Sequence, residues 1–238
     1  MAHDNLIIRR KSLFYSIQIC IIAFVLLATP VSALALGNPS ERGNPTWRNS
    51  TESVLPNYFS FVESVQDGQA GVLRGVYVPD VLALPIVQQP VGHPGFVSNN
   101  DGEITQFGMA AEVGNVGLLA HNYLSGEEFT NLSPGQEVRL IYGDGAVEYF
   151  VVEQILQYQA LQPYSPYSDF RDLDTNITIT AEKLFRMVYR GERHVTFQTC
   201  IEADGNSSWG RLFIIAKPKL FPFVEQQHIH DNLLPYIY

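Results

Sequence analysis

The run His194-Val195-Thr196-Phe197-Gln198-Thr199-Cys200, followed by Arg211-Leu212-Phe213-Ile214-Ile215-Ala216, carries most of the information about the fold of this chain. Both runs are rich in β-branched and aromatic residues, which is typical of β-strands. The segment 201–210 between them is polar, and we expect it to be a ten-residue loop that joins two antiparallel strands. Such a connection would place Cys200 and Arg211 side by side at one rim of a sheet.

Cys200 is one of two cysteines, and the other, Cys20, lies in an apolar N-terminal run. A domain that is exported with a single cysteine has no internal partner for a disulfide. Its thiol is then either used in an intermolecular bond or chemically active. The position of Cys200, where an apolar run meets a polar segment, favours activity.

A reactive thiol needs a nearby base or positive charge. Arg211 carries a guanidinium, which can donate hydrogen bonds to an oxyanion and favour a thiolate. His121 follows the apolar run 116–120, so we expect it at the end of a buried strand, and histidine is the natural acid and base near neutral pH. His194 shares a strand face with Cys200 but lies six residues before it, roughly 20 Å along a regular strand, and is expected at the surface or rim.

The remaining sequence predicts an all-β domain with short helices. The 238 residues are 46% hydrophobic, 16% charged and 12% aromatic, which is typical of a globular protein. Asp144-Gly145, between the strand-like runs 138–142 and 147–152, is a strong hairpin signal. We expect residues 157–174 to form a long surface loop, and residues 177–180 to cap a short helix over 181–188.

Four segments are predicted along the chain. Residues 1–35 combine a basic start, a long apolar run and Ala33-Leu34-Ala35, which indicates a cleaved signal peptide or an uncleaved membrane anchor. Residues 36–70 form a linker and N-terminal segment, 71–220 the folded domain, and 221–238 a C-terminal tail. Either interpretation of the leader predicts that the domain leaves the cytoplasm.

The formal net charge excludes one class of partner. The chain carries −9. Residues 1–35 hold three basic residues and one acid, so residues 36–238 carry −11. Because nucleic-acid binding requires a basic face, we expect no nucleic-acid partner.

The motifs together resemble a known family, the sortases, which are cysteine transpeptidases of the cell surface. The resemblance is carried by Thr196-Phe197-Gln198-Thr199-Cys200, which is similar to the T-L-x-T-C signature of the family. The stretches 115–122, which ends in His121-Asn122, and 209–216, which contains Arg211, are similar to the family's histidine and arginine contexts. The similarity spans about residues 74–218.

The resemblance implies an eight-stranded closed β-barrel and a defined reaction. Cys200 would attack an L-P-x-T-G-like peptide sorting signal of a surface protein and form a thioester. His121 would protonate the leaving amine and then deprotonate the incoming amine, and Arg211 would stabilise the oxyanion or position the substrate. Thr199 and Thr196 would line the substrate site. An amine acceptor of the cell wall or of a pilin would then take the acyl group, at the outer face of the membrane.

Other readings of the residues stay open at this point. A non-catalytic surface β-barrel used for binding or assembly is the main alternative, and a thiol kept for an intermolecular disulfide is a lesser one. Papain-like enzymes place the cysteine before the histidine, and L,D-transpeptidases carry a Ser-His-Gly-Cys-type segment that is missing here. No cofactor is expected. Some sortases bind calcium through acidic loops, but the candidate acids are equally well explained as solvated loop residues: Glu127, Glu128, Glu202 and Asp204.

Overall fold

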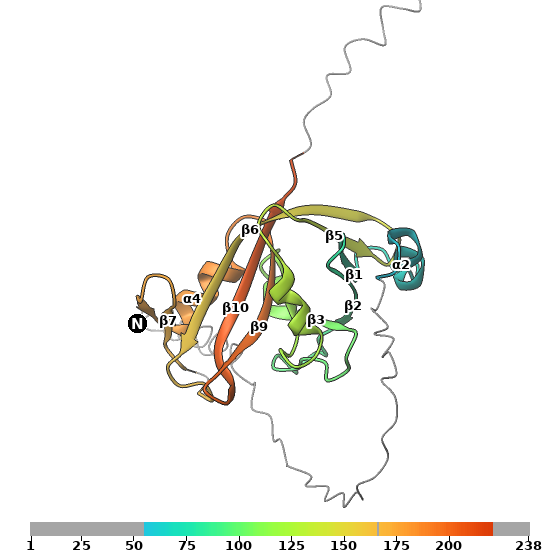
Figure 1. Ribbon diagram of the computed structural model, residues 1–238. Helices are drawn as coiled ribbons and strands as arrows, with labels where there is room; N and C mark the ends of the chain where they lie inside the picture. The colour runs from blue at the N-terminus through green and yellow to red at the C-terminus, as the bar shows by residue number, and fades with distance from the viewer. Residues whose placement is uncertain (1–54, 166, 221–238) are drawn as a thin grey trace, which may run out of the picture.

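The computed structural model describes residues 55–165 and 167–220 (Figure 1). The predicted leader, residues 1–35, and the predicted tail, residues 221–238, lie outside this part of the chain. Within the described ranges, no helix combines the length and the apolar character needed to cross a membrane. In this described part of the chain, the strands and helices fall between Tyr58 and Pro218.

Eight strands close into a barrel, as predicted. Their order around the barrel is β10-β9-β4-β3-β2-β1-β5-β6, and the pairing of β6 with β10 completes the circle. The neighbours are antiparallel except for β2 with β3 and β4 with β9, which are parallel. The strands are β1 (Leu73–Val78), β2 (Leu82–Gln88), β3 (Ile104–Phe107), β4 (Val116–Leu119), β5 (Glu137–Tyr142), β6 (Val147–Ala160), β9 (Val195–Ala203) and β10 (Asn206–Pro218).

Short elements decorate the barrel. Strands β7 (Phe170–Asp172) and β8 (Thr178–Ile179) extend the sheet beyond the far end of β6. Helix α2 (Tyr58–Val65) precedes the barrel, α3 (Gly108–Ala111) follows β3, and the 3-10 helix η1 (Ser125–Asn131) follows β4. Helix α4 (Ala181–Tyr189) leads into β9, and the side chain of Thr180 caps it by accepting a hydrogen bond from the Lys183 amide. The predicted helix is therefore confirmed.

Alternation along the strands separates two apolar cores. Leu118, Phe197 and Ile214 belong to the first core, which fills the barrel. Leu119 and Phe213 have the opposite parity and belong to the second core, which lies outside the barrel wall and includes the buried residues of α4. Each face of β9 and β10 is thus covered, and this double burial explains their nearly continuous apolar sequence.

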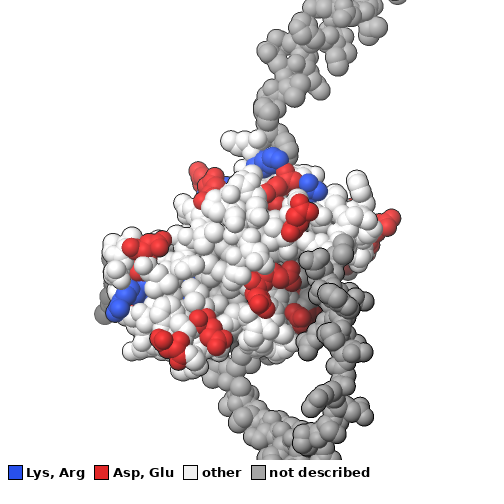
Figure 2. Space-filling model, viewed as in Figure 1, with Lys and Arg blue, Asp and Glu red and all other residues white. Residues whose placement is uncertain are grey.

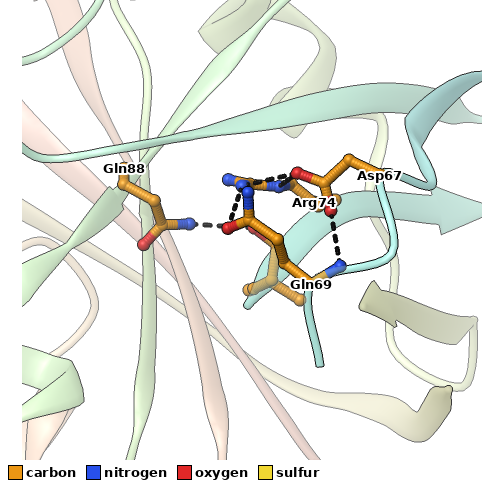
Figure 3. A network of polar contacts seen from close by, with 5 residues as sticks. Asp67, Gln69, Arg74 and Gln88 are labelled. Carbon is orange, nitrogen blue, oxygen red and sulfur yellow. Dashed lines mark hydrogen bonds and ion pairs between the residues drawn. The ribbon is translucent and has the colours of Figure 1, made fainter. Parts of the chain in front are cut away.

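The N-terminal approach to the barrel is fixed by polar contacts (Figure 3). Arg74 donates through Nε to Asp67 Oδ2 at 2.8 Å and through Nη2 to Gln69 Oε1 at 3.1 Å. Asp67 Oδ1 also accepts from the Gln69 amide, and Gln88 Nε2 donates to the Leu73 carbonyl. These bonds tie the turn after α2 to β1 and β2.

The segment 157–174 was predicted to be one long loop, and this prediction is wrong at both ends. Strand β6 continues to Ala160, and β7 begins at Phe170. The tail of β6 is polar on one side because that side is solvated. Its other side carries the buried residues Tyr158 and Ala160, which pack in the second core.

The predicted ten-residue loop between the Cys200 strand and the Arg211 strand is also wrong. Strand β9 runs to Ala203 and β10 begins at Asn206, so that only Asp204-Gly205 form the turn. Their φ angles of 54° and 73° are both positive, which is the requirement of a tight type I′ hairpin turn. The two strands project beyond the core, and their polar residues resemble a loop in sequence.

Candidate active site

Cys200 and Arg211 are paired residues on neighbouring strands. They are direct Cα partners in the antiparallel ladder of β9 and β10. Residues opposite each other in such a ladder present their side chains to the same face. Both side chains are buried, with relative exposures of 6% and 5%. The thiol and the guanidinium therefore share one partly enclosed environment.

His121 reaches the same level from the other side of β9. Strand β4 runs parallel to β9, with Leu119 opposite Gln198, and the Ala120 amide donates to the Gln198 carbonyl at 3.3 Å. Continuing this register by two residues places His121 beside Cys200. The three predicted catalytic residues therefore lie on three adjacent strands in the order β4-β9-β10. Cys200 is on the middle strand, between His121 and Arg211.

A tight turn fixes the backbone after His121. The amides of Leu124 and Gly126 both donate to the His121 carbonyl at 3.0 Å. Asn122 Nδ2 donates to the Ser207 carbonyl at 3.1 Å and thereby ties this turn to the hairpin of β9 and β10. The histidine backbone is consequently attached to both neighbouring elements.

Arg211 is a buried cation without a carboxylate partner in the described part of the chain. Its Nη1 donates to the carbonyls of Ser208 and Gly210, at 3.0 and 2.8 Å. None of the ion pairs among the described residues includes Arg211. A buried charge is costly unless an opposite charge or a set of hydrogen bonds compensates it. The side chain is therefore positioned to bind a negative charge that forms next to Cys200.

The surroundings keep the thiol and the imidazole neutral at rest. Burial raises the pKa of Cys200, and the positive charge of Arg211 and a hydrogen bond from the Ser208 side chain oppose this rise. Burial lowers the pKa of His121, and a hydrogen bond to the backbone of Val97 opposes this change. Desolvation disfavours both charged forms, so the thiolate–imidazolium pair is the minor state.

Two residues of the site were missed in the sequence. Ser208 contacts the thiol, but it lies in the segment that was assigned to a loop. The Tyr123 ring stacks on His121 with 5.1 Å between ring centroids, and its pKa is raised by burial and by the charge of Cys200. Tyr123 is half exposed. Its spacing of two residues from His121 was the only available signal.

Thr199 and Thr196 are both fully buried, on opposite faces of β9. Thr196 Oγ1 donates to the Val188 carbonyl at the end of α4, at 2.5 Å. Thr199 Oγ1 has no hydrogen-bond partner among the described residues and lies against Gly126 of η1. Their roles in substrate binding stay predictions.

The structure corrects the expectation for His194. It is 2% exposed rather than at the surface. Its Nδ1 lies 2.7 Å from the Glu192 carbonyl and its Nε2 lies 2.9 Å from the Val188 carbonyl. The ring therefore contacts one carbonyl in the last turn of α4 and one in the segment that follows the helix, and a strand pattern cannot reveal these contacts.

A cavity of about 540 Å³ lies next to η1, on the lumen side of β9 and β10. Cys200, Tyr123 and Glu202 contribute to its lining, together with the lumen-facing residues Leu212 and Ile214. Neither His121 nor Arg211 lines it. Among the described residues, no group of three or more His, Cys, Asp or Glu is arranged to hold a metal ion.

Comparisons with known proteins give structural neighbours only. No family model and no curated protein matches the sequence. Solved structures do match. Sortase A from Listeria monocytogenes is 11% identical, with a TM-score of 0.40, and the match covers 65% of this chain and 89% of that one. These neighbours are sortases. Sortase C-1 from Actinomyces oris has 14% identity and a TM-score of 0.43, with 76% of this chain and 90% of that chain covered. Sortase A from Corynebacterium diphtheriae has 13% identity and a TM-score of 0.43, and the match covers 70% of this chain and 72% of that one.

Proposed function

We propose that this chain is a sortase-like cysteine transpeptidase that acts on peptide sorting signals of surface proteins. The observation that carries the proposal is the buried Arg211, paired across the ladder with Cys200 and without a carboxylate partner among the described residues. A structural arginine would normally be neutralised. An arginine that stabilises a transient oxyanion must keep its charge available.

The reaction divides into two steps with a thioester between them. In the first step, His121 takes the proton of the Cys200 thiol and Sγ attacks the peptide carbonyl. Arg211 stabilises the oxyanion. When the C–N bond breaks, His121 gives the proton to the leaving amine. In the second step an amine attacks the thioester carbonyl and forms a new amide, and the thiol is regenerated.

The proposed setting is the outer face of the cell membrane. The leader supports this placement, since either a cleaved signal peptide or an uncleaved anchor would export the domain. An L-P-x-T-G-like peptide is the proposed donor. An amine of the cell wall or of a pilin is the proposed acceptor.

The test is to detect the thioester directly. Residues 37–238 would be incubated with a library of L-P-x-T-G-like peptides, and the protein mass would be measured. We expect an acyl adduct on Cys200 that Cys200→Ala cannot form. His121→Ala and Arg211→Ala should reduce its formation by about 100-fold or more. A folded protein that forms no adduct with any peptide would instead support a non-catalytic binding module.

A further inference from the structure

Val97, in the segment between β2 and β3, contacts His121 through its backbone. The ring of His121 donates a hydrogen bond to the Val97 carbonyl, and Val97 itself is buried in the second core. A carbonyl that accepts from one imidazole nitrogen fixes the tautomer of the ring, so that the other nitrogen is the one that exchanges protons. It also favours the imidazolium, because the charged ring keeps this donor when it gains its second proton. The Val97 carbonyl therefore affects both the orientation and the charge of the histidine.

The position of Val97 depends on a bond between the next residue and β3. The Ser98 amide donates to Thr105 Oγ1 at 2.8 Å, and both residues are buried. Thr105 is fixed in turn by backbone pairing with Leu119 of β4, whose side chain packs in the second core. His121 follows Leu119 by two residues and shares its face of the barrel wall. The Thr105 hydroxyl thus joins the segment that carries the Val97 carbonyl to the strand beside the histidine.

Further polar contacts hold the same segment. Ser98 Oγ donates to Glu103 Oε1 at the start of β3. The Gly102 amide donates to Ser125 Oγ at 2.9 Å, and Ser125 is the first residue of η1. The segment is thus attached both to β3 and to the helix that follows the candidate catalytic histidine.

From this geometry we propose that Thr105 is a positioning residue: its hydroxyl holds the Val97 carbonyl against the ring of His121 and thereby fixes which ring nitrogen exchanges protons with Cys200. The effect on catalysis rests on the proposed transpeptidase function. Because Thr105 acts through Val97, its loss should change the state of the histidine and leave the affinity for the peptide unchanged.

The activity test removes the hydroxyl and then restores it. Thr105→Val replaces the hydroxyl by a methyl group, so the Ser98 amide loses its acceptor. We expect thioester formation to be about tenfold slower, through kcat with KM unchanged, because the ring is no longer held in one orientation. Thr105→Ser restores the hydroxyl and should recover most of the rate. A rate that Thr105→Ser does not recover, or a loss confined to KM, would overturn the proposal.

A matched control separates positioning from a general loss of stability. The Asn57 side chain caps α2 by accepting from the Ser60 amide at 3.0 Å, and α2 packs on a separate apolar cluster. Asn57→Ala should lower the free energy of unfolding without slowing thioester formation. Equal losses of rate in Asn57→Ala and Thr105→Val would overturn the proposal.

A second variant tests the same segment if Thr105→Val does not fold. Ser98→Ala removes the bond to Glu103 and keeps the backbone amide that donates to Thr105. We expect a smaller loss of rate in the same direction, again in kcat. An unchanged rate in Ser98→Ala would then overturn the proposal.

The state of the histidine can be measured without any substrate. With ¹⁵N-labelled histidine, the wild type should show a single neutral tautomer of His121, and Thr105→Val a mixture; His121→Ala identifies the signal. The pKa of His121 should fall in Thr105→Val, because the carbonyl no longer supports the imidazolium. An unchanged tautomer and pKa would overturn the proposal. These changes in a wild type that forms no thioester would remove the transpeptidase function and leave the positioning role supported.

The surface charge is a competing influence on the ring. Acidic side chains outnumber basic ones on the face drawn in Figure 2, and an acidic field also favours an imidazolium. Salt at about 1 M shortens the screening length to about 3 Å, but it leaves a hydrogen bond in place. The difference in the pKa of His121 between the wild type and Thr105→Val should therefore persist at high salt, and its disappearance would overturn the proposal. The titratable and charged groups around the ring are the same in both proteins: Tyr123, Cys200, Arg211 and Glu103.

Discussion

Cys200 and Arg211 are direct Cα partners across the β9–β10 ladder, and both side chains are buried. This pairing affects the pKa of the thiol. Burial raises the pKa of Cys200, and the positive charge of the Arg211 guanidinium opposes part of this rise. The tight turn at Asp204-Gly205 and the hydrogen bonds from Arg211 to Ser208 and Gly210 fix the arrangement.

The first prediction concerns the reactivity of the thiol. Because burial raises the pKa of Cys200, alkylation by iodoacetamide should have its midpoint above the ordinary value of about 8.5. Arg211→Ala removes the opposing positive charge and should move the midpoint to still higher pH. Arg211→Lys keeps the positive charge, so its alkylation midpoint should lie between those of the wild type and Arg211→Ala. Mass spectrometry of alkylation rates measures this series, and a midpoint that falls in Arg211→Ala would contradict it.

The second prediction is a broad bell-shaped pH dependence of kcat/KM. In the proposed mechanism the active form needs thiolate and imidazolium together, while the pKa of His121 is lowered and that of Cys200 is raised, in both cases mainly by burial. As pH falls below the His121 pKa, under about 6.5, the thiolate is lost without any gain in imidazolium. Above the Cys200 pKa, over about 8.5, the imidazolium is lost without any gain in thiolate. A narrow optimum with both limbs between these values would show that the two pKa directions are wrong.

The third prediction concerns Gly126. A Cβ at this position would overlap Thr199 Oγ1 and lie 2.6 Å from the His121 carbonyl oxygen. Gly126→Ala should therefore destabilise the domain by about 1–3 kcal/mol and displace the His121 backbone, with at least tenfold slower thioester formation. Gly108→Ala is the control, since its Cβ would meet only the flexible end of Gln89. Urea unfolding and thioester mass measurements test both variants, and equal behaviour would refute the steric argument.

The fourth prediction concerns Asn115, which joins the start of β4 to two other elements. Its Nδ2 donates to the Tyr189 carbonyl at 3.0 Å, and its Oδ1 accepts from the His194 amide at 2.9 Å. Asn115→Ala leaves two buried backbone groups unpaired and should cost about 2–4 kcal/mol in the free energy of unfolding. Asn100→Ala, at an exposed amide, should cost less than about 1 kcal/mol. Comparable losses in the two variants would show that burial of the amide is not decisive.

The predictable parts of the fold are those with local signals. Asp144-Gly145 fixed the hairpin of β5 and β6, and Thr180 marked the start of α4, because both act on their immediate neighbours. The placement of His121 at a strand end followed from the apolar run before it. These features needed no knowledge of the tertiary structure.

The parts that failed depend on contacts between distant segments. Asp204-Gly205 carries the same turn signal as Asp144-Gly145. The strand ends around it are polar because they project beyond the core, and for this reason residues 201–210 resembled a loop. The burial of His194 depends on the carbonyl of Val188 in α4. The parallel register that brings His121 to Cys200 is a property of the closed barrel, and no spacing in the sequence reveals it.

The parallel pairing of β4 with β9 determines the stage of folding at which His121 and Cys200 come together. It joins strands whose site residues, His121 and Cys200, are 79 positions apart, and closing so large a loop is among the slow events of folding. Until it closes, the cysteine has neither its proton acceptor nor its enclosed surroundings. A newly made chain therefore carries an ordinary thiol, and the proposed reactivity towards peptides can arise only after the barrel has closed.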